Sequence, residues 1–179
     1  MKKFVLILSA ILVSTLFCSC KSDDSSSSNS DAKVTTITNN AQFSGNNPAI
    51  ANAINETYAT ALDTSVYPYA QELFISVDED KKLIDYTIVV QNDTTSDEAV
   101  EYSTTLLTML NDYASSHDDS IAKSSDGYYG GVFDEYSALL TVATEDSVLT
   151  ESDWLVCQTI DAGTNAPVQA GGYNDNSNS

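Results

Sequence analysis

Two runs of alternating apolar residues near the middle of the chain constrain its fold more than any other feature. In the first run, Leu73, Ile75 and Val77 fall on one face. The second run places four apolar residues on one face: Ile84, Tyr86, Ile88 and Val90. Alternation with a period of two is typical of a strand that buries one side. Charged residues 78–82 separate the runs and suit a turn, so the sequence predicts a β-hairpin with one half-buried face.

Two amphipathic helices are predicted on either side of this hairpin, at Pro48–Asp63 and Asp97–Ser116. Asn47 is a good N-cap for the first helix, and a proline follows it at a position where the missing amide hydrogen would have no partner. Thr95 and Glu98 stand in the capping-box relation at the start of the second helix. Apolar residues recur at spacings of three and four in both segments, so each helix is expected to bury one side.

The remaining segments have weaker patterns. Alternation predicts a strand over Tyr136–Thr144. Tyr128–Phe133 could form its partner strand, although the paired glycines there favour a bend or bulge. Ser152–Gly163 is open between two structures: an N-cap serine and a terminal glycine favour a helix, which we expect, whereas its β-branched residues favour a strand. Val34–Thr38 is a candidate for a short edge strand.

Together these elements predict an α+β fold of two layers. Two or three helices are expected to pack on one face of a mostly antiparallel sheet of three to five strands. The predicted domain covers residues 48–163, which is enough chain for one core. Residues 20–47 are rich in Ser, Asp and Asn and are predicted to form a tether, and residues 164–179 a flexible tail.

The first twenty residues have the layout of an export signal. Two lysines follow Met1, apolar or small residues extend from Phe4 to Phe17, and Cys18-Ser19-Cys20 closes the segment. At about 1.5 Å of rise per residue the apolar run spans only ~20 Å, which is shorter than the ~30 Å hydrocarbon core of a bilayer. We therefore expect residues 1–19 to be removed as a signal peptide.

The end of this signal, Leu16-Phe17-Cys18-Ser19 before Cys20, resembles the lipobox of bacterial lipoproteins. Leu16 and the small Ser19 match that pattern, whereas Phe17 and Cys18 depart from it. The resemblance implies that Cys20 receives a diacylglycerol group, which would anchor an extracytoplasmic protein to a bacterial membrane by an N-terminal lipid. Ordinary secretory cleavage near the same residues and an uncleaved anchor are the alternatives.

The charge of the chain argues against several classes of partner. Its formal net charge is −19, and it becomes −21 once Lys2 and Lys3 leave with the signal peptide. The sequence contains no arginine, the residue that binds phosphate in two-point fashion. So acidic a surface repels nucleic acid and anionic lipid heads, and we expect no nucleic-acid binding. His117 and Cys157 leave too few soft ligands for a zinc site, and we expect no cofactor.

Tyrosines are the candidate ligand-binding residues. Tyr67, Tyr69, Tyr128 and Tyr129 fall in predicted loops, where flat rings can stack on sugars or anchor a protein partner. The alternative is that these rings cover sheet edges and pack against the core.

Other arrangements carry less specific signals. His117 could activate the thiol of Cys157, or two carboxylates could hydrolyse a glycoside. Acidic residues 78–80 and 118–119 could bind calcium weakly, although neither cluster has the EF-hand spacing. We therefore predict a membrane-tethered, exported lipoprotein that acts as a non-catalytic binding module of the cell envelope, with an envelope protein or a glycan as its ligand. A small extracytoplasmic hydrolase is the alternative.

Overall fold

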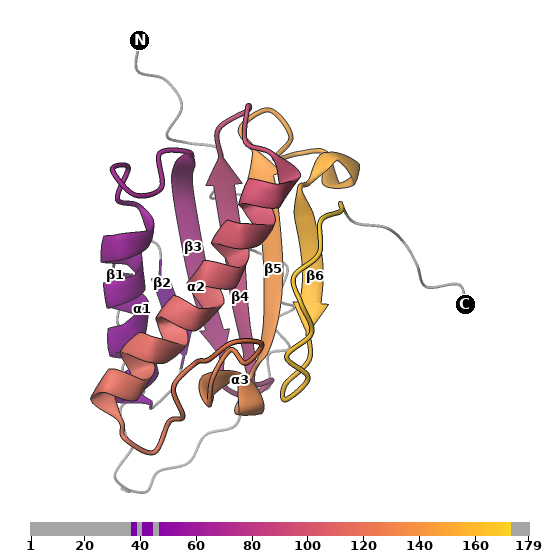
Figure 1. The fold of residues 1–179 in the computed structure, drawn as a ribbon. Coiled ribbons are helices and arrows are strands. Elements are labelled where there is room, and N and C mark those ends of the chain that lie inside the picture. Colours follow the sequence, from indigo (N-terminus) through magenta and orange to yellow (C-terminus); the bar gives the residue numbers. More distant parts are fainter. Residues whose placement is uncertain (1–36, 39–40, 45–46, 173–179) are drawn as a thin grey trace, which may run out of the picture. The chain divides into compact units, whose positions relative to one another are not determined.

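Helices α1 (Pro48–Ala61) and α2 (Ser96–His117) lie on the same side of a mixed sheet in the computed structural model (Figure 1). The structure describes residues 37–38, 41–44 and 47–172, which all fall within one unit of the chain, Ala32–Ser179. The strands lie side by side in the sheet in the same order as in the sequence, from β1 to β6.

The direction of each strand depends on how it is connected to its neighbour. The bounds are β1 Ile37–Thr38, β2 Ala41–Ser44, β3 Ala70–Asp78, β4 Leu83–Val90, β5 Ser137–Thr144 and β6 Val156–Ile160. Strands joined by a short connection are antiparallel: β1 with β2, β3 with β4, and β5 with β6. β2 runs parallel to β3, and β4 runs parallel to β5. A parallel pair needs a long crossover, which α1 supplies in the first case and α2 in the second.

Capping residues fix where both helices begin. The side chain of Asn47 accepts hydrogen bonds from the amides of Ala49 and Ile50 at the start of α1. At α2, Thr95 and Glu98 form both hydrogen bonds of a capping box. These contacts satisfy amides that have no partner within the helix. Both predicted helix starts are thereby confirmed.

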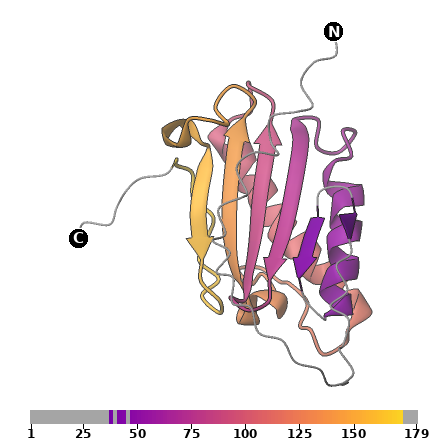
Figure 2. The same cartoon turned by 180° about the vertical axis from the view of Figure 1, so that it is seen from behind.

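The core lies between the two helices and one face of the sheet. Alternate residues of the central strands are buried there: Leu73, Ile75, Val77, Ile84, Tyr86, Ile88, Ala138, Leu140 and Val142. Tyr102 of α2 is fully buried, and its hydroxyl donates to the carbonyl of Ala61 at the end of α1 over 2.6 Å. Seen from behind, the strands stand in front of the helices (Figure 2).

The α+β class is confirmed, with helices packed on the sheet. The predicted hairpin is β3 and β4, and its predicted inward residues are buried. Strands β3 to β6 form the body of the sheet, and the short β1 and β2 extend it. Ile37–Thr38 is strand within the candidate edge segment, and the rest of that segment lies outside the described residues.

The helix expected over Ser152–Gly163 is wrong, and the strand alternative is correct. Glu151–Asp153 makes one short turn of 3₁₀ helix, and β6 follows it. Gly163 does not end a helix but adopts a φ of +73° in the turn after β6. Pairing with β6 gives hydrogen-bond partners to the backbone N–H and C=O groups of β5, whose core-facing residues are already buried. This need for a neighbouring strand outweighs the local signals for a helix.

Tyr128–Phe133 is not a partner strand of β5. Tyr128 makes a single isolated bridge with Ser125, and the short helix α3 (Val132–Glu135) follows. Gly130 adopts a φ of +107°, a left-handed conformation that does not continue an extended strand. The bend favoured by the paired glycines is therefore correct.

The ends of the folded region differ from the predicted boundaries. β1 and β2 pair into the sheet although they fall in residues 20–47, the predicted tether. After β6, part of the predicted tail contacts that strand: Gln158 donates to the carbonyl of Pro167, and the amide of Gly171 donates to Leu155. No helix among the described residues is long and apolar enough to cross a membrane.

Candidate functional site

Tyr67 and Tyr69 pack against the buried ring of Tyr102. Their ring centroids lie 5.1 Å and 5.6 Å from that of Tyr102, and both side chains are half-buried. Burial raises the pKa of Tyr69, with a further contribution from the carboxylates of Glu101 and Glu98. These two residues of the α1–β3 connection therefore pack their rings on Tyr102, and the carboxylates of Glu98 and Glu101 act on Tyr69.

Tyr128 and Tyr129 lie in the connection between α2 and α3. The ring of Tyr129 is buried, and its hydroxyl donates to the carbonyl of Ala166. The hydroxyl of Tyr128 donates to the carboxylate of Asp134. Among the described residues no ring contact joins this pair to Tyr67 and Tyr69. A binding role for the four tyrosines stays a prediction, but they form two separate groups that each hold a loop in place.

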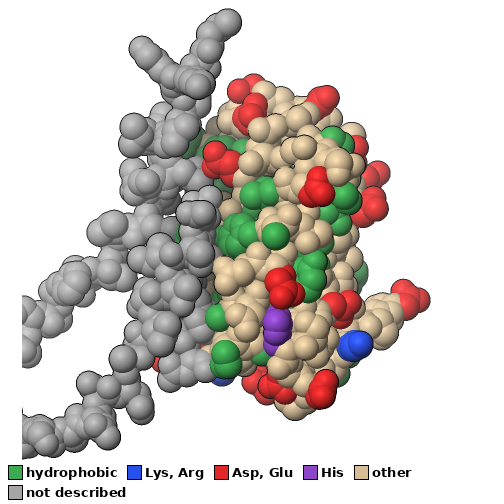
Figure 3. All heavy atoms as spheres, turned by 90° about the vertical axis from the view of Figure 1, so that its left-hand side faces the viewer, with side chains coloured by type: hydrophobic (Ala, Val, Ile, Leu, Met, Phe, Trp, Pro, Cys, Tyr) green, Lys and Arg blue, Asp and Glu red, His purple; other side chains and the backbone are tan. Residues whose placement is uncertain are grey.

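His117 and Cys157 are not brought together. His117 ends α2 and pairs with Glu56 of α1, with 2.9 Å between Nε2 and Oε1. Figure 3 shows this histidine on the surface beside acidic side chains. Cys157 is in β6, on the opposite edge of the sheet from α1 in both ribbon views. Burial also raises the pKa of the Cys157 thiol, which disfavours the nucleophilic thiolate.

Replacing His117 with alanine is expected to change little. The His117–Glu56 pair is partly exposed, with 32% and 43% of the two side chains accessible. Pairs of this kind contribute about 0.5 kcal/mol or less to stability. The free energy of unfolding from urea titration should therefore stay within about 0.5 kcal/mol of the wild-type value. A much larger loss, or the disappearance of any hydrolytic activity, would contradict the structural role assigned to His117.

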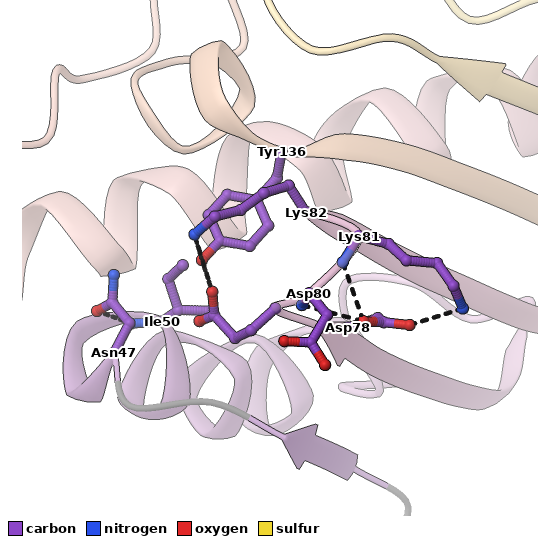
Figure 4. Close-up of polar contacts among 8 residues, drawn as sticks. Asn47, Ile50, Asp78, Asp80, Lys81, Lys82 and Tyr136 are labelled. Carbon is purple, nitrogen blue, oxygen red and sulfur yellow. Dashed lines mark hydrogen bonds and ion pairs between the residues drawn. The ribbon is translucent and has the colours of Figure 1, made fainter.

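The two acidic clusters stabilise separate turns, and Figure 4 shows the one that contains Asp78 and Asp80. Asp78 accepts from the amides of Asp80 and Lys81 and forms an ion pair of 2.8 Å with the Lys81 ammonium group. Asp118 likewise accepts from the amide and hydroxyl of Ser120. These hydrogen bonds hold the pKa of Asp78 and of Asp118 below the usual range. Across the described ranges no three His, Cys, Asp or Glu side chains group closely enough to hold a metal ion.

A cluster of Glu79, Lys82 and Tyr136 joins the β3–β4 turn to the start of β5. The Lys82 ammonium lies 2.9 Å from Glu79 Oε2, 3.1 Å from the Tyr136 hydroxyl and 4.5 Å from the centre of its ring. Burial, and then the hydrogen bond to Glu79, raise the pKa of Tyr136 to about 12. The Tyr136 phenol is therefore protonated at neutral pH and acts as a hydrogen-bond donor. The cluster is better explained as a structural contact between the turn and β5 than as a site in which Tyr136 is a catalytic base.

The two long helices do not cover the face of the sheet opposite them, on which Val89 and Ala143 are nevertheless buried. We define this open face by six half-buried residues of the central strands: Phe74, Ser76, Asp85, Thr87, Leu139 and Thr141. Two rows cross the strands in register. One is Phe74, Thr87 and Thr141, and the other is Ser76, Asp85 and Leu139. The open face therefore mixes apolar and hydroxyl groups around one carboxylate.

Asp85 is the one charged residue among these six, none of which was a candidate from the sequence. Its Oδ1 atom is buried and has no hydrogen-bond partner among the described residues. Burial raises the pKa of its carboxyl above the ordinary value of 3.8, and no other cause contributes. In the sequence Asp85 falls on the polar side of an alternating strand, where an acid is unremarkable; only the register and the burial distinguish it.

Comparison with known proteins gives no match to this chain, whether with models of protein families, with curated proteins or with solved structures.

Proposed function

We propose that this protein is an exported lipoprotein, anchored through Cys20, whose domain is a non-catalytic binding module of the cell envelope. Cys20 lies outside the described residues, so this part of the proposal rests on the lipobox resemblance of residues 16–20. The domain contributes the binding surface, which we assign to the open face.

The observation that carries the binding role is the one-sided packing of the sheet. Both long helices cover one face, and the opposite face presents Phe74 and Leu139 together with the hydroxyls of Thr87 and Thr141. A flat surface that mixes apolar and hydrogen-bonding groups is typical of protein interfaces. A protein partner therefore fits the open face better than a glycan, because Phe74 is the single aromatic ring among its six residues and is half-buried.

A substitution on the open face tests this proposal. Thr141→Arg places a long charged side chain in the middle of the face and is expected to abolish the binding of the natural partner. The matched control is Asn55→Arg, because Asn55 is exposed on α1, away from the open face, and the change in charge is the same. Each tagged protein would be purified from gently solubilised membranes, and the proteins that co-purify with it would be quantified by mass spectrometry.

Loss of a co-purifying protein from Thr141→Arg, with retention by Asn55→Arg, supports the open face. Retention by both variants, when thermal unfolding shows that both are folded, would contradict it. A glycan ligand held by the tyrosines would instead survive Thr141→Arg and be lost from Tyr128→Ala.

A further inference from the structure

We propose that the partner presents a basic segment to the open face, in which a lysine or arginine side chain pairs with Asp85. This inference rests on the proposed function above and specifies the chemistry of the ligand. Three features support it: the position of Asp85, the lack of a cation for it among the described residues, and the groups that surround it.

Asp85 occupies the middle of the open face. It lies in β4 with Ser76 of β3 opposite on one side and Leu139 of β5 on the other. Its Oδ1 atom is buried without a donor among the described residues, and its burial raises the carboxyl pKa. A carboxylate that is partly withdrawn from water and has no donor is unfavourable. A ligand that brings a charged donor to it would remove this cost on binding.

The described part of the chain supplies no cation for Asp85. Lys81 pairs with Asp78 and Lys82 with Glu79, both in the β3–β4 turn. Lys123, the remaining lysine of the described residues, interacts electrostatically with the carboxylate of Asp112. A cation for Asp85 would therefore come from outside the described residues, and a chain with a net charge of −19 attracts basic partners from a distance.

The neighbours of Asp85 fit a long cationic side chain. Lysine and arginine carry an apolar stem and a charged head. Leu139 and Phe74 offer apolar surface for such a stem, and the Asp85 carboxylate would receive the head. Backbone or side-chain groups of the partner could meet the hydroxyls of Thr87 and Thr141.

Two other occupants fit less well. A second copy of this chain would bring further negative charge and contains no arginine. A metal ion would need several ligands, and no group of three candidate ligands lies within the described residues. Of these three occupants, a basic protein segment best compensates the charge of Asp85.

The test compares Asp85→Asn with Asp119→Asn in the mature lipidated protein, held in neutral detergent. Asp119 is exposed, so this control has the same change in net charge without touching the open face. The probes are two short capped peptides, one of alternating valine and lysine and the other of alternating valine and glutamine. Fluorescence anisotropy would measure their affinity at physiological ionic strength, where charges that lie far apart are screened.

Binding of the lysine peptide is expected to weaken about tenfold in Asp85→Asn and less than about twofold in Asp119→Asn. The glutamine peptide should bind weakly to all three proteins. Equal losses in the two variants would overturn the proposal, because they would show that net charge alone attracts the peptide. If the natural partner is lost from Thr141→Arg but kept by Asp85→Asn, the open face stands and its basic ligand does not.

Asp85→Asn should remain folded, and its stability gives a second readout. The raised pKa means that ionised Asp85 disfavours the folded state at neutral pH, and that this penalty fades as pH falls through the folded-state pKa towards 3.8. Asp85→Asn should therefore unfold at a higher temperature than the wild type at neutral pH, with a difference that shrinks in acid. A variant less stable than the wild type at neutral pH would show that the carboxylate already has a partner within the chain, which would overturn the proposal.

Discussion

Replacement of Gly130 by alanine is expected to destabilise the domain by about 3 kcal/mol or more. Gly130 has a φ of +107°, and a Cβ atom there would lie 1.9 Å from Asn111 Nδ2 and 2.1 Å from Asn111 Cγ. Asn111 is fully buried in α2, and it cannot move without losing hydrogen bonds that its side chain makes. Its Nδ2 donates to the carbonyl of Ala122, and its Oδ1 accepts from the amide of Val132. Urea titration would measure the loss.

Gly127→Ala is the matched control for Gly130→Ala. Gly127 also has a positive φ, +72°, but an added Cβ would meet nothing within 4 Å. Only backbone strain remains there, at a cost of about 1 kcal/mol. In an Asn111→Ala background the collision disappears, so Gly130→Ala should then cost much less than it does alone. Similar losses from the two glycine substitutions would contradict the close approach of Gly130 to Asn111.

Replacement of Cys20 by serine is expected to abolish membrane attachment. A hydroxyl at this position cannot receive the thioether-linked diacylglycerol that the lipobox resemblance implies. Fractionation of cells should find wild-type protein with the membranes and the Cys20→Ser variant depleted from them. Cys18→Ser is the matched control, because that residue would leave with the signal peptide. Equal membrane attachment of Cys20→Ser and the wild type would contradict the lipid anchor.

Local signals were sufficient to predict the two long helices, α1 and α2, and the central hairpin. The Asn47 cap and the Thr95–Glu98 capping box act within a few residues, so they can be recognised without the tertiary structure. The alternation in β3 and β4 similarly identifies the side that faces the core. These features depend on neighbours along the chain.

The features that the sequence did not predict depend on neighbours across the sheet. β6 replaced the expected helix because β5 needs a hydrogen-bonding partner, a requirement that residues 152–163 do not record. Tyr136 reaches Glu79 and Lys82 only because β5 pairs with β4. The position of Asp85 beside Leu139 likewise depends on the register between β4 and β5. Tertiary packing also determines what the four loop tyrosines contact. The sequence placed these residues in loops but did not show the partners of their rings.

The mass of the protein isolated from its native membranes would show whether Cys20 carries the lipid anchor. A chain that begins at Cys20, lacks residues 1–19 and carries the added mass of a diacylglycerol group, with or without a further acyl chain, is the predicted result. A mass that matches the sequence with Met1 retained and Cys20 unmodified would contradict the anchor, and with it the assignment of the acidic domain to the outside of the cell.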